Sequence, residues 1–462
     1  MRRATPLLRL FVAALLGALL FTAPAEPGPG PGRPIRPKPG NTDAMLWDKA
    51  QRIQARMWHH LSPEGLLVYE HGQGAGPDGL SYAVLSLSDS AIWTGCYLGA
   101  QACRWSVTRD PDALAQVDHL LRGLDFLAQV TGTPGRLCRS AGRLADGRAR
   151  PRNVVDSPSL PGYVFQDDVS RDQLSGVVFG LVLVLHYVDD PALVARAEAT
   201  LGVIARRLAS DNMWLRNSKG RKTEFGEMRA SVEHLPMVKN GPLAAIGYAA
   251  FSVMGNRPGD PWFRKRKDSM DRDGWRNALT EQHTWLGSQI TMTNVNMVTL
   301  GLTPIVLGGD RLARDNARRG LRALYAASRG WWNAGTCACH LLVDSKVDSR
   351  ALVDEIRATL HIMSEQEIPF AGTRMVRTGR VVNIRERGIV DWAWKIHVDA
   401  ARIPPPGATL DPVKTYTRAD WLFAYWLSRA AGELTPESGP GAQSPPPPLV
   451  VDRPPWMAAP GR

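Results

Sequence analysis

Hydrophobic positions along this chain recur at helical spacing in long blocks. In residues 111–130 the apolar side chains Leu114, Val117 and Leu121 step by three and four residues, which predicts a helix with one buried face. Residues 192–211 repeat the pattern. A more uniformly apolar block precedes each of them, so the predicted unit is a pair of helices.

A very short loop with an Asp joins the two helices of each pair. Asp is a good N-cap because its carboxylate accepts backbone N–H groups, and Pro suits the first helical position, where its missing N–H costs nothing. Loops this short force antiparallel neighbours, so each copy is a helical hairpin. Four copies are found, with their caps at Asp110-Pro111, Asp190-Pro191, Asp310 and Asp348.

The two members of a pair differ in character. The first member is small, apolar and marked by glycine, as in "TGCYLGA" (94–100) and "SGVVFGL" (175–181), which both carry G-x-x-x-G. Glycine at that spacing lets helices approach closely, and a helix that is apolar all round is buried. The first members are therefore expected to form an inner ring and the amphipathic second members an outer ring, because repeated hairpins must stack to bury their apolar faces.

The pattern predicts a chain of helices with almost no strand. Residues 255–275 are expected to form a charged, Pro-containing loop, and residues 365–390 an irregular segment with up to two strands. The predicted helices span residues 44–60, 86–105, 111–130, 171–189, 192–211, 229–252, 276–308, 310–328, 332–343, 347–363 and 415–431.

The hairpin repeat resembles the six-hairpin (α/α)6 toroids of many glycoside hydrolases, polysaccharide lyases and sugar epimerases. The resemblance also rests on the segments "SDSAIWTGCYLGAQA", "SRDQLSGVVFGL" and "YTRADWLFAYWLSR". The resemblance implies an all-α fold, an (α/α)6 toroid over residues 42–431, and activity on a carbohydrate. It matches the catalytic signature of no single family.

The two ends of the chain are predicted to lie outside this domain. Residues 1–25 read as a secretory signal peptide, with early Arg residues, a short apolar run and a small-residue cleavage site near Ala25. Residues 26–41 read as a Pro/Gly-rich linker and residues 432–462 as a Pro-rich disordered tail. We expect an exported protein, periplasmic or extracellular, without a membrane span, because no later stretch is long and apolar enough.

The charge of the chain bears on its binding partners, and its cysteine content bears on disulfides and metal binding. The formal net charge is +12, with basic runs at 264–267 and 143–152 that are expected in loops. These runs suit either an acidic partner or a solvated basic surface; no nucleic-acid motif is present. The five Cys are an odd number, so at least one is not in an intramolecular disulfide. Cys337-x-Cys339-His340 is only half a metal site, so no metal and no cofactor are predicted.

Glycoside cleavage needs two carboxyl groups, one as a general acid and one as a nucleophile or base. Asp89 and Asp172 are the predicted catalytic pair, because both stand just before or at the start of a predicted inner helix, where the funnel of a toroid opens. Arg171 beside Asp172 could hold a substrate carboxylate. The alternative is that both Asp residues serve only as helix caps.

A saccharide or polysaccharide, with acidic polymers among the candidates, is the predicted partner, and the oligomeric state stays open. The chain has 15 Trp, whose flat rings stack on sugars or fill a wide helical core. Residues expected to line the funnel and bind substrate are Trp93, Tyr163, Gln166, Arg171, Trp332, Trp392, Arg418 and Asp420.

Two rival functions remain. A lyase or epimerase acting on uronic sugars would need a His or Tyr base beside groups that neutralise the substrate carboxylate. Its candidates are His234, Tyr163, Arg139, Asn294 and Asn296. A non-catalytic saccharide-binding protein would need only an aromatic-lined groove.

Asp167 and Asp168 form an acidic pair close to the predicted catalytic Asp172. Carboxylate oxygens are suitable ligands for calcium. The pair therefore suits either a calcium site or a surface loop.

Overall fold

The structure of the protein is a computed structural model. The described residues begin beyond the predicted signal peptide and end before most of the predicted tail. They are residues 32–68, 70–73, 80–81, 89–143, 153–232, 235–282, 291–344, 349–365, 374–387, 392–395, 397–403, 406–407 and 414–436.

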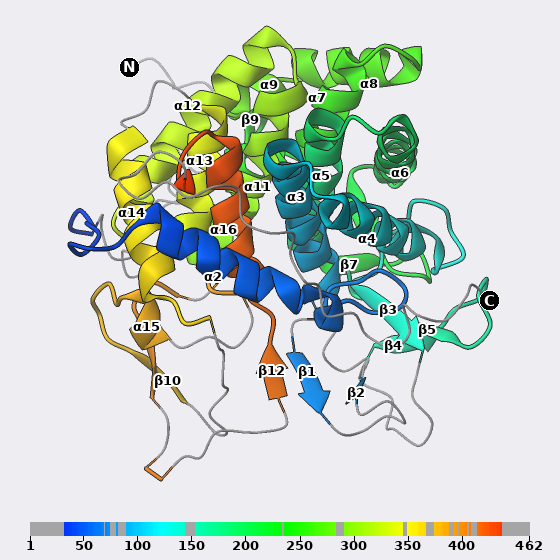
Figure 1. The fold of residues 1–462 in the computed structure, drawn as a ribbon. Coiled ribbons are helices and arrows are strands. Elements are labelled where there is room, and N and C mark those ends of the chain that lie inside the picture. Colours follow the sequence, from blue (N-terminus) through cyan, green and yellow to red (C-terminus); the bar gives the residue numbers. More distant parts are fainter. Residues whose placement is uncertain are drawn as a thin grey trace, which may run out of the picture.

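Six helices form a closed inner ring, in which each helix contacts the next and the last contacts the first (Figure 1). Their residues are buried around most of the helix circumference, as the sequence predicts for the first members of the hairpins. The inner helices are α3 (Ser90–Thr108), α5 (Arg171–Tyr187), α7 (Gly241–Asn256), α11 (Met292–Gly308), α13 (Ala334–Val343) and α16 (Ala419–Ala430).

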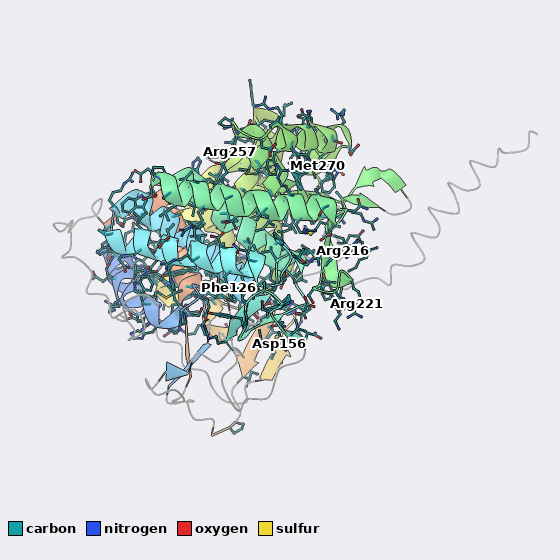
Figure 2. The ribbon with its side chains drawn as sticks, turned by 90° about the vertical axis from the view of Figure 1, so that its right-hand side faces the viewer. Phe126, Asp156, Arg216, Arg221, Arg257 and Met270 are labelled. Atoms are coloured by element: carbon teal, nitrogen blue, oxygen red, sulfur yellow. The ribbon has the colours of Figure 1, made fainter. Side chains whose placement is uncertain are left out.

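Each inner helix packs against an outer, amphipathic helix. Figure 2 faces this outer layer, where α4 and α6 run side by side across the molecule. The outer helices are α4 (Pro111–Gln129), α6 (Pro191–Ser210), α8 (Pro261–Arg272), α12 (Arg311–Ser328), α14 (Ser349–Ile362) and α2 (Asp43–Ala55). The alternation of inner and outer helices around a closed ring is the predicted (α/α)6 toroid.

The sixth hairpin combines the two ends of the domain. Among the described residues, α16 is the last helix and α2 the first, and they contact each other, while α16 also contacts α3. In Figure 1 the blue α2 and the red α16 lie together on one side of the ring. The ring therefore closes only when both ends of the domain are folded.

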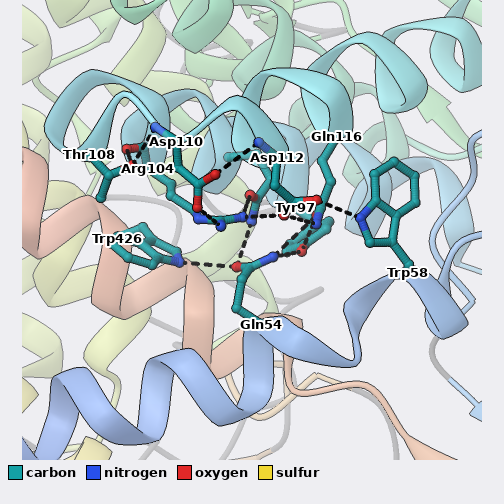
Figure 3. A network of polar contacts seen from close by, with 10 residues as sticks. Gln54, Trp58, Tyr97, Arg104, Thr108, Asp110, Asp112, Gln116 and Trp426 are labelled. Carbon is teal, nitrogen blue, oxygen red and sulfur yellow. Dashed lines mark hydrogen bonds and ion pairs between the residues drawn. The ribbon is translucent and has the colours of Figure 1, made fainter. Parts of the chain in front are cut away.

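A buried polar network stabilises this closure (Figure 3). Gln54 on α2 donates to the Tyr97 hydroxyl at 2.9 Å, and Trp426 on α16 donates to the Gln54 side-chain oxygen at 3.3 Å. Arg104 on α3 donates to Asp112 at 2.9 Å. Four helices from two hairpins thus share one hydrogen-bonded network. Its members are Gln54, Trp58, Tyr97, Gln101, Arg104, Asp110, Asp112, Gln116 and Trp426.

Helices α3 and α5 approach each other backbone to backbone. A Cβ added at Gly95 would lie 2.1 Å from the Gly176 carbonyl oxygen, and one added at Gly180 would lie 2.2 Å from the Gly95 carbonyl oxygen. No side chain fits at either position. The G-x-x-x-G pairs are therefore the reason that these inner helices pack so closely, as the sequence predicts.

The strands are short and antiparallel, and they lie in the connections that lead from an outer helix to the next inner helix. Figure 1 shows β1, β10, β12 and the β3–β5–β4 sheet below the helices. These long connections gather at the end of the ring where the inner helices begin. The strands are β1 (Glu70–Gln73), β2 (Leu80–Ser81), β3 (Ser140–Arg143), β4 (Val154–Asp156), β5 (Tyr163–Gln166), β6 (Trp214–Arg216), β7 (Lys222–Glu227), β8 (Ser231–Val232), β9 (Leu235–Lys239), β10 (Arg374–Arg377), β11 (Ala400–Ile403) and β12 (Lys414–Tyr416).

Two predicted segments have the wrong secondary structure. Residues 229–240 were expected to begin a helix, but they contain β8 and β9, and α7 begins only at Gly241. The predicted loop 255–275 contains α8, whose N-cap Asp260 accepts the backbone N–H of Trp262 at 2.9 Å. The basic run 264–267 therefore lies on an outer helix, not in a loop.

The predicted Asp caps at 110, 190 and 310 accept backbone N–H groups of the following helix. Asp348 lies outside the described residues. All five Cys are free and buried. No helix among the described residues has the length and apolar character needed to span a membrane.

The described part of the predicted linker packs on the fold. Ile35 is buried, and the backbone N–H of Gly32 donates to the Arg329 carbonyl at 2.9 Å. The predicted signal peptide and residues 437–462 of the predicted tail lie outside the described residues.

Candidate functional site

The candidate site lies at the end of the ring where the inner helices begin. Its centre is a cluster of four side chains, Asp89, Arg139, Gln173 and Lys395, here named the Asp89 cluster. One Asp89 carboxylate oxygen accepts hydrogen bonds from Arg139 at 2.7 Å and from Gln173 at 3.0 Å, and the other accepts from the Lys395 ammonium. Four segments far apart in sequence therefore meet at one carboxylate.

The surroundings of Asp89 hold it in the ionised form. Burial alone would raise its pKa, but the charges and hydrogen bonds of Lys395 and Arg139 outweigh this effect and bring the pKa below its usual value of 3.8. Asp89 immediately precedes α3, yet its side chain accepts no backbone N–H of that helix. Its carboxylate therefore does not cap α3. The alternative interpretation of the sequence, in which Asp89 serves only as a helix cap, is not supported.

Asp172 lies in the first turn of α5 and is half-buried. The N-cap position of α5 belongs to Ser170, whose backbone N–H donates to the Gln173 side chain at 3.0 Å and whose hydroxyl donates to Asp172. Asp172 is therefore not the N-cap of α5.

Arg139 interacts electrostatically with both predicted catalytic carboxylates. It donates to the Ser170 hydroxyl at 3.4 Å as well as to Asp89. Burial lowers the Arg139 pKa, but Asp89 and Asp172 both raise it, and the net direction is upward. The two carboxylates are therefore connected through Ser170, Gln173 and Arg139 at the mouth of the ring.

Trp93 and Trp392 stack on each other next to this cluster. Their ring centroids lie 4.5 Å apart with an interplanar angle of 2°, and each residue is 2% exposed. The Lys395 ammonium lies 5.6 Å from the centroid of the Trp93 ring. The sequence suggested that both rings stack on a sugar, but in this structure each covers one face of the other.

The β3–β5–β4 sheet separates two of the other predicted binding residues. Gln166 pairs with Ser140 beside the Asp89 cluster, whereas Tyr163 stands at the opposite end of β5. The Tyr163 ring packs against Phe126 of outer helix α4, with centroids 5.2 Å apart. Gln166 therefore lies near the candidate site and Tyr163 points toward the outer layer. Arg171 is half-buried, and burial lowers its pKa despite the opposing effect of Asp172.

Arg418 and Asp420 are buried behind the site. Their side chains are 0% and 1% exposed and form an ion pair at 3.6 Å. Asp420 accepts the backbone N–H of Ala393 at 3.1 Å, and its own carbonyl accepts the Trp394 indole N–H at 3.1 Å. Burial raises the Asp420 pKa, although Arg418 and backbone N–H groups, that of Ala393 among them, act against it. The pair positions the segment that carries Trp392 and Lys395, where the sequence predicted side chains open to the funnel.

Trp332 lies in a strained turn just before α13. Its φ of 56° is in the left-handed region, which a bulky residue rarely adopts. Buried Glu355 accepts the Gly330 backbone N–H at 2.9 Å, and buried Arg387 donates to the Trp332 carbonyl at 3.3 Å. These two charged side chains fix the turn, and Trp332 stays half-buried.

Two of the residues considered for a lyase lie at or next to the candidate site, whereas Asp167 of the acidic pair considered for calcium is hydrogen-bonded to Ser218. His234 lies outside the described residues. Asp167 accepts the backbone N–H and the hydroxyl of Ser218, at 2.6 and 2.7 Å. No group of three or more potential metal ligands occurs among the described residues. Arg139 lies in the Asp89 cluster, and Asn296 lies below it, on α11.

Sequence reasoning placed Gln173 in a polar segment expected to line the funnel but gave it no specific role, and it missed Lys395. Gln173 occupies the position three residues after the cap of α5, where its side-chain oxygen completes a capping box. That pattern was visible in the sequence, but its second contact to Asp89 was not. Lys395 reaches Asp89 across 306 residues of sequence, and no spacing rule could connect them.

No family model and no curated protein matches the chain. Among solved structures, it is similar to cellobiose 2-epimerase from Spirochaeta thermophila, at 12% identity over 84% of this chain and 96% of that chain, with a TM-score of 0.42. It is also similar to the GH76A alpha-1,6-mannanase from Salegentibacter, at 10% identity over 85% of this chain and 100% of that chain, with a TM-score of 0.42. Because both the sequence identities and the TM-scores are low, the assignment of the toroid fold rests on the order and packing of the helices in this chain.

Proposed function

We propose that this protein binds a saccharide at the mouth of the inner ring and cleaves a glycosidic bond there. Asp89 is the ionised carboxylate of the reaction and Asp172 the proton donor. One observation carries the proposal: two carboxylates from neighbouring inner helices meet through Ser170, Gln173 and Arg139, and neither is used as a helix cap.

Glycoside cleavage needs one carboxyl group in each protonation state. Lys395 and Arg139 keep Asp89 ionised. Asp172 accepts the Ser170 hydroxyl and has no ion pair with a cation among the described residues. Of the two carboxyl groups, Asp89 is the one with direct ion pairs among the described residues, so the proposal gives it the role of base or nucleophile and leaves the role of acid to Asp172.

A buried charge is costly unless it is paired, and paired charges in a fold core can often be replaced by apolar groups without loss of stability. Arg139, Asp89 and Lys395 therefore need a reason to be at the mouth of the ring. Perturbed carboxylates in such a place are typical of functional sites. This supports a catalytic or binding role over a purely structural one.

A saccharide-binding protein without turnover is the second candidate. It is favoured by the three donors on Asp89, since a carboxylate with its oxygens engaged is a poorer nucleophile. For the lyase alternative, Tyr163 is not supported as the base, because it lies at the far end of β5 from the cluster, and the other candidate base, His234, lies outside the described residues.

The test is a screen for reducing-end release from neutral and acidic polysaccharides. Asp172→Asn is expected to reduce turnover at least 100-fold, because general acid catalysis contributes on the order of 10²–10⁴. The matched control is Asp190→Asn, at the cap of outer helix α6, which is expected to keep wild-type turnover. Equal turnover in wild type and Asp172→Asn would overturn the catalytic assignment, and saccharide binding without cleavage would favour the second candidate.

We further propose that the protein is exported after cleavage near Ala25, on the character of residues 1–25. N-terminal sequencing of the mature protein tests this. A start close to residue 26 is expected, and a mature chain that retains residues 1–25 would contradict it.

A further inference from the structure

A small cavity lies within the first turns of the inner helices, directly below the Asp89 cluster. Aromatic rings of Trp93, Trp392, Trp394 and Phe423 form part of its wall. It has room for about one water molecule, at about 20 Å³. The cavity adjoins the candidate site because Trp93 both lines it and carries Lys395 over its ring.

Three polar atoms of the cavity-lining residues have no hydrogen-bond partner among the described residues. They are the indole Nε1 of Trp93, the amide Nδ2 of Asn296 and the hydroxyl Oγ1 of Thr299, and all three are buried. A buried polar atom without a partner costs free energy. In native proteins such atoms usually have a bound water molecule, ion or ligand as their partner.

The orientation of Asn296 follows from its neighbours. The Asn333 side-chain oxygen accepts the backbone N–H of Thr336 at 3.1 Å, so the Asn333 amide nitrogen is the donor to its next partner. That partner is the Asn296 oxygen, at 3.1 Å, which also accepts the Thr336 hydroxyl at 3.0 Å. The Asn296 amide nitrogen is therefore the atom left to face the cavity, and it is a donor.

These atoms define the chemistry of an occupant. Trp93 and Asn296 offer N–H donors, and the Thr299 hydroxyl can donate or accept. An occupant that bonds to all three groups must therefore contain an acceptor oxygen. None of the three groups is charged, and the space is too small for a carboxylate, so a neutral hydroxyl group or a water molecule fits the cavity.

We propose that this cavity is an end subsite, which takes one hydroxyl group of the terminal residue of a saccharide and leaves the rest of the sugar at the Asp89 cluster. The inference deepens the proposed function and rests on it. A subsite with room for one hydroxyl group admits a chain end and not the interior of a polymer, so the substrates are oligosaccharide ends or small sugars.

The test is calorimetric titration of wild-type protein with D-glucose, D-mannose and D-galactose, and with matched deoxy forms of the sugar that binds most tightly. The test variant is Thr299→Val, which removes the hydroxyl at nearly constant volume. The control is Thr303→Val, one turn further along α11, whose hydroxyl is satisfied by the Thr299 carbonyl at 2.9 Å and which does not line the cavity.

Thr299→Val is expected to weaken binding of the best sugar about 3- to 10-fold, the effect of one hydrogen bond, and Thr303→Val to leave it unchanged. One deoxy form is expected to bind wild type and Thr299→Val equally. Equal affinities of wild type and Thr299→Val for the parent sugar would overturn the inference, as would the absence of binding by all three sugars, which leaves a water molecule as the occupant.

The experiments distinguish a failure of the end subsite from a failure of the proposed cleavage. Sugar binding that depends on Thr299, with no cleavage in the polysaccharide screen, keeps the end subsite and removes the cleavage step. Cleavage that depends on Asp172, with equal sugar affinities in both Thr variants, keeps the cleavage step and removes the end subsite.

Discussion

At the level of single residues, the Asp89 carboxylate holds the candidate site together. It receives hydrogen bonds from two cations and an amide, and its pKa lies below 3.8 in the folded protein. Because the folded pKa is depressed, the contribution of Asp89 to stability is present above pH 3.8 and is lost as the pH falls through the folded pKa.

Asp89→Asn is expected to lower the free energy of unfolding by about 1–3 kcal/mol at pH 7, because Arg139 and Lys395 are left facing each other without their shared partner. The difference from wild type should persist from neutral pH to about pH 5 and shrink below pH 3.8. Urea unfolding at several pH values measures it. A difference that grows on acidification would contradict the assignment of Asp89 as the ionised partner.

The site could be predicted from the sequence only where local pattern carried it. Asp89 and Asp172 were found because they stand at the starts of inner helices. The roles of Arg418 and Asp420 could not be found in this way, since both stand at the start of α16 and yet are fully buried. Helix position gives the end of the ring on which a residue lies, but not whether the side chain faces the core or the mouth.

At the scale of the elements, close packing of α3 on α5 depends on glycine. Gly95→Ala is expected to destabilise the protein by about 3 kcal/mol or more, since its Cβ would lie 2.1 Å from backbone of α5. Gly202→Ala on outer helix α6 is the control, because its Cβ would meet nothing closer than 3.5 Å. That variant should be neutral or more stable by about 0.5–1 kcal/mol. Thermal unfolding of both compares them, and similar losses would contradict the close approach.

Most helices could be predicted because their caps and periodicity are local. The third hairpin was missed although Asp260-Pro261 repeats the Asp-Pro start of α4 and α6, because the high charge of 264–272 suggested a loop. The strands β8 and β9 were missed because apolar residues within 229–240 continue smoothly into α7. Short strands that pair only with each other leave little periodic signal.

At the scale of the whole molecule, the ring is closed by its two ends through the network around Gln54 and Arg104. Arg104→Met is expected to cost about 3–5 kcal/mol, because it leaves the buried Asp112 without its cation. Arg109→Met is the control, since its ion pair with Asp189 is exposed to solvent and should contribute little to stability. Chemical denaturation separates the two variants; equal effects would show that the network does not hold the ring closed.

Asp89 and Asp172 are proposed to form a catalytic pair, and the pH dependence of kcat/KM on a cleaved polysaccharide is the decisive measurement of this pair. We expect activity to fall on the acid side only as the pH drops below about 3.8, where Asp89 gains a proton, and Asp172→Asn to lose turnover at every pH. An acid limb centred above pH 5, full turnover in Asp172→Asn, or no cleavage of any polysaccharide would contradict the claim.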